Sequence, residues 1–360
     1  MPDRASFAER IAGRIVVAGF DGTELPHDLA QDARRGALGG LVLFKRNVES
    51  HAQVAALLAE LAGLAPEDAP SIAAVDQEGG RVVRLREPLT VLPPMRALGR
   101  ADDAGLTRDA GLLVGRELCA LGFTLDFAPV LDLDTNPKSP VIGDRSFGAD
   151  PRLVARHGLA FASGLREGGV WPCAKHFPGH GDATVDSHEA LPRVTHEADR
   201  LRSLEMAPFA AWAAARSGPI MTAHIVCPAL DPALPATMSA AIVTGELRER
   251  LGFDGPVLSD DLEMGAIAEM GGPAAAAVSA VRAGVDGLLV CRSLALRSEV
   301  IATLAREATD DPVFSDLLER AAARLSPLGR PCGPVRPLSW IGSDEHICLK
   351  ESILSRLGRS

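Results

Sequence analysis

The sequence contains no long hydrophobic run: no apolar stretch reaches the roughly 18 residues that a membrane-spanning helix needs. Its beginning, MPDRASFAERIAGRIVVAGF, lacks an uninterrupted apolar segment followed by a small-residue cleavage site, so it does not resemble a signal peptide. The six cysteines are scattered and form no CxxC motif, which is typical of free thiols in a reducing compartment. These absences predict a cytoplasmic protein that does not enter a membrane.

Basic residues are also in deficit, with 37 Lys and Arg against 47 Asp and Glu and a formal net charge of −10. A nucleic-acid surface would need clustered Lys and Arg to neutralise phosphates, so nucleic acid is excluded as a partner. The 360 residues are 47% hydrophobic and 23% charged, which is ordinary for a globular enzyme. Because α/β barrels often form one domain of about 250 residues or more, we expect a single large domain.

Short apolar runs recur along the chain, and most are continuously apolar rather than alternating, as buried parallel strands are. Eight such runs predict strands: Arg14–Phe20, Gly40–Arg46, Ser71–Gln77, Phe123–Val130, Trp171–Phe177, Pro219–Ile225, Pro256–Asp261 and Val285–Cys291. Helical patterns lie between them, the clearest at Ala104–Leu121, Pro151–Glu167, Glu197–Ala215 and Pro273–Ala283. Eight strand–helix units favour a closed (β/α)8 barrel of the TIM type, in the α/β class, over an open sheet.

The composition changes after Arg324, where the sequence continues LSPLGRPCGPVRPLSWIGSD. Its prolines interrupt helices and strands alike. We therefore predict a barrel domain at residues 1–324 and a Pro-rich C-terminal tail at residues 325–360, packed on the surface or partly disordered.

Polar residues gather where the predicted strands end. A barrel places these ends on one rim, where barrel enzymes have their active sites. Charged groups at the ends of apolar strands are costly unless they are paired or solvated. Four clusters fit this pattern: Asp76-Gln77-Glu78-Gly79-Gly80-Arg81, Lys175-His176, Ala223-His224 and Ser259-Asp260-Asp261.

The densest cluster is the loop from Lys175 to His188, which holds three histidines, two acids and a lysine. Asp186 lies two residues before His188, close enough in an extended or turning loop to fix the tautomer of the imidazole. Taken alone, Asp186 is better interpreted as a helix cap, and Asp260 could cap the next helix as well. The residues do not decide between Asp260 and Asp261 as the reactive acid.

The other acids and arginines have simpler interpretations. Asp76 could start the turn at Gly79, and Arg84 and Arg145 could be ordinary ion-pair partners. Three acids within or just after the fourth predicted strand are expected to be structural, or to support residues of the site, rather than to be catalytic: Asp126, Asp132 and Asp134.

Three motifs in order, VDQEGGRVVRL, KHFPGHGDATVDSHEALP and GFDGPVLSDDLEMGAI, resemble the β-N-acetylglucosaminidase branch of glycoside hydrolase family 3. Within it they are most similar to bacterial enzymes of peptidoglycan recycling. The resemblance runs from about Gly13 to Arg292. It implies that Asp260 is the catalytic nucleophile, His188 the general acid/base and Asp186 its partner. It implies substrate binding by six further residues: Asp76, Arg84, Arg145, Lys175, His176 and His224.

The implied activity is retaining hydrolysis, in which a covalent glycosyl-enzyme forms and water releases the sugar. The implied substrate is N-acetylglucosamine linked to anhydro-N-acetylmuramic acid, with or without its peptide. No cofactor or metal is expected, no partner is expected besides this carbohydrate, and one compact domain suggests a monomer.

Other functions remain open on the residues. A metal-dependent hydrolase could use His176, His180, Asp182, Asp186 and His188, although most of these ligands would come from one loop. A family variant could use phosphate in place of water, or accept a β-glucoside. A sugar-binding protein without catalysis is opposed by the presence of every acid and base.

Overall fold

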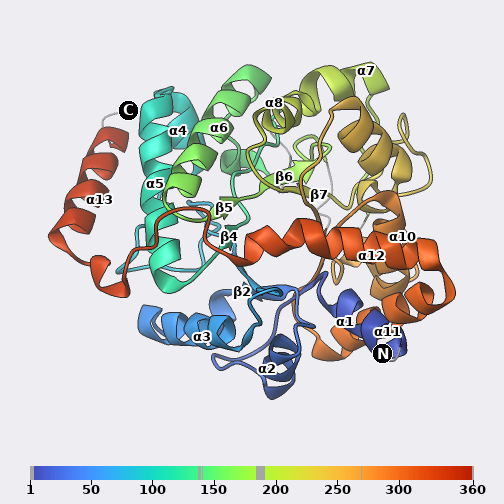
Figure 1. The fold of residues 1–360 in the computed structure, drawn as a ribbon. Coiled ribbons are helices and arrows are strands. Elements are labelled where there is room, and N and C mark those ends of the chain that lie inside the picture. The colour runs from blue at the N-terminus through green and yellow to red at the C-terminus, as the bar shows by residue number, and fades with distance from the viewer. Residues whose placement is uncertain (1–3, 137–138, 140, 184–190, 269, 359–360) are drawn as a thin grey trace.

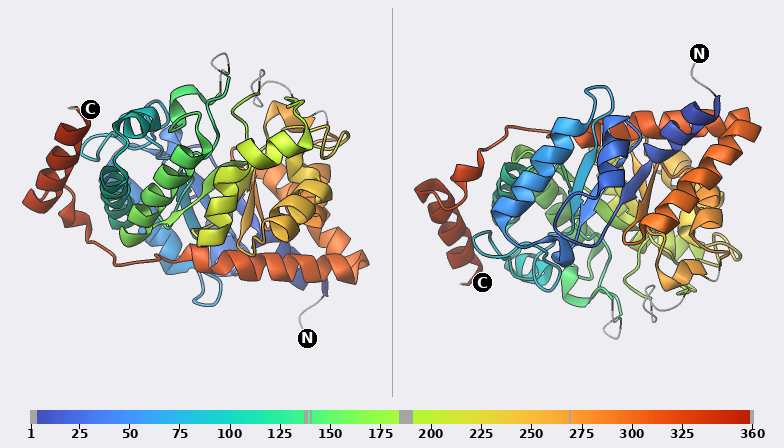
Figure 2. Two further views of the ribbon diagram at one scale, coloured as in Figure 1. Left: turned by 90° about the horizontal axis from the view of Figure 1, so that it is seen from above. Right: turned by 90° about the horizontal axis from the view of Figure 1, so that it is seen from below.

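The computed structural model describes residues 4–136, 139, 141–183, 191–268 and 270–358. Parallel strands form the centre, and helices surround them (Figures 1 and 2). The strands are β1 Val16–Ala18, β2 Gly40–Leu43, β3 Ile72–Val75, β4 Leu125–Asp126, β5 Trp171–Pro172, β6 Ala174–Phe177, β7 Ile220–Thr222, β8 Val257–Asp261 and β9 Gly287–Val290. Each lies inside one of the eight predicted runs, so the predicted strands are confirmed.

The sheet runs in the order β5-β4-β3-β2-β1-β9-β8-β7-β6, and every strand pair is parallel. The two outer strands of this order, β5 and β6, are consecutive pieces of one run that is interrupted only at Cys173. An isolated parallel bridge joins Val130, which follows β4, to Lys175 of β6. Because β5 and β6 count as one interrupted strand, the nine strands form an eight-stranded, nearly closed barrel, as the apolar runs predicted.

The helices fill the intervals between strands. They are α1 Arg4–Gly13, α2 His27–Arg34, α3 His51–Leu64, α4 Met95–Ala101, α5 Ala104–Leu121, α6 Pro151–Glu167, α7 Ala198–Arg200, α8 Ala207–Ala215, α9 Gly265–Ala268, α10 Pro273–Ala283, α11 Leu294–Asp310, α12 Pro312–Leu325 and α13 Asp344–Leu357. Wider π-helical turns occur at Leu201–Glu205 and Ala241–Arg250. None of the helices in the described chain is long and apolar enough to cross a membrane.

Local signals explain the helix ends. Asp103 caps α5 by accepting a hydrogen bond from the Leu106 N–H, and Asp150 caps α6, with Pro151 in its first turn. Gly284 ends α10 with φ of 107°, a left-handed conformation that glycine adopts without a Cβ clash. The helix predicted over Glu197–Ala215 is divided instead, because Pro208 lacks the N–H that would continue the ladder.

The C-terminal residues cross the outside of the barrel and end in α13, which lies beside α5 (Figure 1). Ion pairs hold the two helices together, since Arg356 contacts both Asp103 and Asp109 at 2.9 and 3.0 Å. The division into a barrel at 1–324 and a tail at 325–360 stays a prediction.

Candidate active site

A cavity of about 190 Å³ opens at the carboxyl ends of the strands. Its polar lining comes from the loops after β3 and β4 and from β6 and β8, and apolar side chains complete its wall. The lining residues are Val42, Phe44, Asp76, Glu78, Val82, Arg84, Phe127, Val141, Arg145, Lys175, His176, His180, Met221, Asp260, Asp261, Leu289 and Cys291. The cavity therefore brings together most of the residues that the sequence singled out.

A buried ion-pair network forms one side of the cavity. Lys175 Nζ lies 2.7 Å from Asp76 Oδ1 and 2.6 Å from Glu78 Oε1. Arg84 contacts the other Asp76 oxygen at 3.0 Å. Arg145 holds Glu78 with two hydrogen bonds of 2.8 and 2.7 Å. The side chains of Asp76, Arg84, Arg145 and Lys175 thus have fixed positions before any substrate enters.

Charge balance keeps this network ionised. Burial raises the pKa of Asp76, but Lys175 and Arg84 outweigh it and hold the pKa well below its usual range. Burial likewise opposes ionisation of Glu78, and Arg145 and Lys175 lower its pKa to about 2. Three cations therefore face two carboxylates, and neither carboxylate takes up a proton near neutral pH.

We expect Glu78→Gln to lower the free energy of unfolding by about 3 kcal/mol, because it removes one partner of a buried ion pair. Glu78 is 2% exposed and bridges Lys175 and Arg145. The control is Glu167→Gln, whose pair with Arg108 is exposed and should be worth less than about 1 kcal/mol. Urea unfolding of both variants measures the difference. Equal effects would show that the network adds nothing to stability.

His176 is oriented by a buried carboxylate. Its Nδ1 lies 2.6 Å from Asp132 Oδ2, and Asp132 also accepts the backbone N–H groups of His176 and His180. Because Nδ1 is engaged with this carboxylate, the other ring nitrogen is the one left for the cavity. The sequence interpretation of Asp132 as structural is consistent with this contact, although it did not connect Asp132 to His176.

The structure separates the two acids at the end of β8. Burial raises the pKa of Asp260, but His176 and His224 outweigh this effect and lower it. Burial, assisted by Glu263 and Asp260, raises the pKa of Asp261 to about 6. Asp261 Oδ1 also accepts the N–H groups of Glu263 and Cys291. An attacking carboxylate must be ionised and accessible, and Asp260 stays ionised to lower pH than Asp261, whose carboxylate is engaged by two backbone N–H groups, so Asp260 is the better candidate.

His224 occupies a different place from the one expected of a substrate-binding residue. It is fully buried and does not line the cavity. Its Nδ1 lies 2.9 Å from Thr237 Oγ1, and its Nε2 lies 3.0 Å from the Asp261 carbonyl. Both ring nitrogens are thus occupied by protein groups, and the ring supports the backbone that carries Asp260 and Asp261.

We expect His224→Phe to lower kcat by about tenfold or more while KM changes less than about twofold, because the variant displaces Asp260 and removes no contact to substrate. His157→Phe is the control, since His157 is equally buried and bonded to Thr107 and Asp102 away from the cavity. Steady-state measurement of kcat and KM for both variants tests this prediction. A large rise in KM for His224→Phe would restore the substrate-binding role.

Below the network lies an unusual carboxyl group, Asp126. It is fully buried, its Oδ1 accepts the Gln77 N–H at 2.9 Å, and its Oδ2 has no partner in the described structure. Burial raises its pKa to about 8. This buried carboxyl group, which does not line the cavity, is therefore mainly neutral up to about neutral pH.

Two of the predicted catalytic residues, Asp186 and His188, lie outside the described residues. Other residues of the cavity were not predicted to bind the sugar: Glu78, His180, Phe44 and Cys291. A signal existed for Glu78, because it lies two residues after Asp76, the spacing that puts side chains on one side of an extended segment. Phe44 and Cys291 close apolar runs and resemble core residues in sequence.

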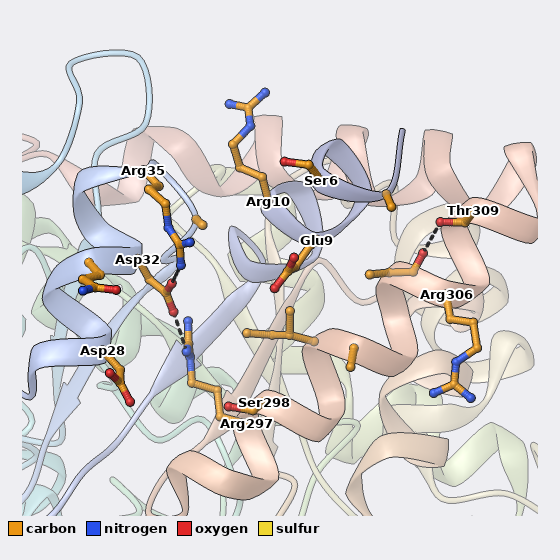
Figure 3. A pocket seen from close by; sticks show the side chains of 16 residues that line it. Ser6, Glu9, Arg10, Asp28, Asp32, Arg35, Arg297, Ser298, Arg306 and Thr309 are labelled. Atoms are coloured by element: carbon orange, nitrogen blue, oxygen red, sulfur yellow. Dashed lines mark hydrogen bonds and ion pairs between the residues drawn. The ribbon is translucent and has the colours of Figure 1, made fainter. Parts of the chain in front are cut away.

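A larger hollow of about 790 Å³ lies on the outside of the barrel between α1, α2 and α11 (Figure 3). Two of its arginines, Arg35 and Arg297, form ion pairs with Asp32. It contains none of the residues that the strand ends contribute. Across the described part of the chain, no three His, Cys, Asp or Glu side chains are arranged to hold a metal ion.

Comparisons with known proteins agree with the site. A model of the glycosyl hydrolase family 3 N-terminal domain matches residues 12–326. The beta-hexosaminidase of Thiobacillus denitrificans is 42% identical over 291 residues, 79% of each chain. A family 3 beta-N-acetylglucosaminidase from Paenibacillus sp. str. FPU-7 is 41% identical with a TM-score of 0.90, over 97% of this chain and 68% of that one. Native NagZ from Neisseria gonorrhoeae is 32% identical with a TM-score of 0.79, over 95% of this chain and 97% of that one. The predicted resemblance is confirmed: the chain belongs to glycoside hydrolase family 3.

Proposed function

We propose that the protein is a retaining exo-β-N-acetylglucosaminidase that removes terminal N-acetylglucosamine from peptidoglycan fragments during cell-wall recycling. The observation that carries the proposal is the position of Asp260 in the same cavity as the Asp76–Lys175–Glu78 network. The cavity is smaller than the roughly 300–1,000 Å³ of sites for larger ligands, which favours one terminal sugar over a chain. The names of the similar proteins support the acetamido sugar.

The chemistry follows from the roles proposed for three residues. Asp260 attacks the anomeric carbon, and the bond to the leaving oxygen breaks as His188 donates its proton to that oxygen. The neutral His188 then takes a proton from water, whose oxygen attacks the same carbon and releases Asp260. Asp186 keeps the imidazole oriented through both steps. The configuration is inverted twice and thus retained.

The sugar itself would be held by the fixed network. The carboxylates of Asp76 and Glu78 accept hydrogen bonds from hydroxyl groups, and Lys175, Arg84 and Arg145 donate them. His176, held by Asp132, presents its free nitrogen to the cavity. We further propose an anhydromuropeptide aglycone, a cytoplasmic location, a monomeric state, and the division into a barrel at 1–324 and a tail at 325–360.

The test is release of 4-nitrophenol from the N-acetyl-β-glucosaminide and the β-glucoside, with and without EDTA and with and without phosphate. We expect chelator-resistant hydrolysis of the acetamido sugar, with free N-acetylglucosamine as the product. Loss of activity with EDTA would establish the metal-dependent alternative. A sugar 1-phosphate as the product would establish phosphorolysis, and preference for the glucoside would overturn the sugar class.

A further inference from the structure

The C-terminal helix α13 contacts the loop that carries one side of the active site. The β3–α4 loop, residues 76–94, contains Asp76, Glu78 and Arg84 at its beginning and Thr90 near its end. Helix α13 lies beyond residues 12–326, the part of the chain that matches the family domain. Figure 1 shows α13 at the edge of the molecule, beside α4 and α5.

A buried chain of hydrogen bonds links this helix to the loop. Glu117 of α5 accepts both the N–H and the hydroxyl of Thr90, the latter at 2.6 Å. The same carboxylate lies 2.7 Å from His346 Nε2. His346 Nδ1 accepts the Gly342 N–H at 3.0 Å, so Nε2 is the nitrogen that donates to Glu117. All three members of this linkage, Thr90, Glu117 and His346, are 1% exposed.

Further contacts reinforce the same connection. Trp340 packs edge-on against the His346 ring at 5.0 Å between centroids. Lys350 of α13 pairs with Glu87 of the loop at 3.0 Å. Leu354 and Leu357, at the end of the helix, line the same surface pocket as Leu92 of the loop.

The loop transmits this support to the site through its own hydrogen bonds. The Gly80 N–H donates to the Leu92 carbonyl at 2.8 Å, which joins the two arms of the loop. Gln77 Oε1 accepts the N–H groups of Arg84 and Leu85, and Gln77 Nε2 donates to the Leu85 carbonyl. The residues next to Asp76 and Glu78 are thus bonded to the segment that Thr90 anchors.

We infer that α13 braces the sugar-binding side of the active site, and that the Thr90–Glu117–His346 linkage is its positioning element. The inference rests on the proposed function only in naming the sugar that is bound. Without the His346 donor, a buried carboxylate loses a partner, and Thr90 loses the fixed position of its acceptor. The β3–α4 loop then samples positions in which Asp76, Glu78 and Arg84 no longer match the substrate.

The test compares three variants of the full-length chain. His346→Leu removes the donor, His346→Gln keeps an N–H donor, and Arg356→Met removes ion pairs between α13 and α5 that do not touch the loop. We expect His346→Leu to raise KM and weaken N-acetylglucosamine binding by about 3- to 30-fold, with kcat changed less than about twofold. His346→Gln should recover most of the loss, and Arg356→Met should leave KM unchanged.

A second readout does not depend on the substrate. Amide hydrogen exchange of residues 77–85 should be faster in His346→Leu and in Thr90→Val, a milder change that removes one hydrogen bond. Unchanged KM, binding and exchange in a destabilised His346→Leu would show that α13 only stabilises the fold and would overturn the inference. A wild type that does not bind N-acetylglucosamine would instead refute the proposed function, while exchange would still test the brace.

Discussion

Asp260→Asn is expected to reduce kcat for 4-nitrophenyl N-acetyl-β-glucosaminide by about 10³-fold or more, since an amide oxygen cannot replace the attacking carboxylate. Asp260 lines the cavity, and His176 and His224 outweigh burial to keep its pKa low. Asp260→Gly sharpens the test, because it leaves space for azide. Azide would attack the anomeric carbon from the side of the missing carboxylate, expel nitrophenolate and yield the α-glycosyl azide.

The neighbouring acid is the matched control. Asp261→Asn keeps an oxygen that can accept the N–H groups of Glu263 and Cys291, so its cost should be that of weakened hydrogen bonds, less than about tenfold in kcat. Near-equal activity of the two asparagine variants would remove the nucleophile assignment. An inactive Asp261→Asn beside an active Asp260→Asn would transfer the role to Asp261.

The barrel was predictable from sequence because its signals are local. Continuous apolar runs such as Gly40–Arg46 and Val285–Cys291 identify buried strands without any knowledge of their neighbours. The common rim then follows from topology, and it placed Asp76, Lys175 and Asp260 at one cavity. The choice of family needed the motifs, since strand–helix alternation occurs in many unrelated enzymes.

The supporting contacts were not predictable in this way. Asp132 orients His176 from 44 positions away, and Glu117 meets His346 across 229 positions. No periodicity records such pairs, because each depends on how the chain closes in three dimensions. His224 shows a different gap: its position at a strand end was predicted, but the hydrogen bonds that occupy both of its ring nitrogens were not.

Asp126→Asn is expected to make the free energy of unfolding less dependent on pH. Burial raises the pKa of Asp126 to about 8, whereas an unfolded aspartate has a pKa near 3.9. Between these values the native state holds a proton that the unfolded state has released. Asp126 therefore makes the wild type less stable as pH rises from about 4 to about 8, by at most about 1.4 kcal/mol per pH unit.

Asparagine has no carboxyl proton to lose, so this destabilisation disappears in the variant. The amide group placed at the unpartnered Oδ2 position adds a cost, but that cost is the same at every pH. The free energy of unfolding of Asp126→Asn, relative to wild type, should thus improve by about 2 to 4 kcal/mol between pH 5 and pH 8. Urea unfolding at the two pH values measures it.

Asp231→Asn is the control for this comparison. Burial raises the pKa of Asp231, but hydrogen bonds from Ser239, Ala233 and Leu234 outweigh it and lower the pKa. Its stabilisation is lost only when pH falls through that lowered pKa, so the cost of Asp231→Asn should be constant from pH 5 to pH 8. A constant difference for Asp126→Asn as well would show that Asp126 is ionised in the native state.

The protonation of Asp126 also matters to the site above it. A charged carboxylate there would join Asp76 and Glu78 in attracting Lys175, whose ammonium now contacts those two acids. A neutral group at 126 leaves the ion-pair network undisturbed, and asparagine reproduces that neutrality. We therefore expect Asp126→Asn to keep activity within about threefold of wild type near pH 7, while an activity loss approaching that of Asp260→Asn would assign Asp126 a proton that catalysis uses.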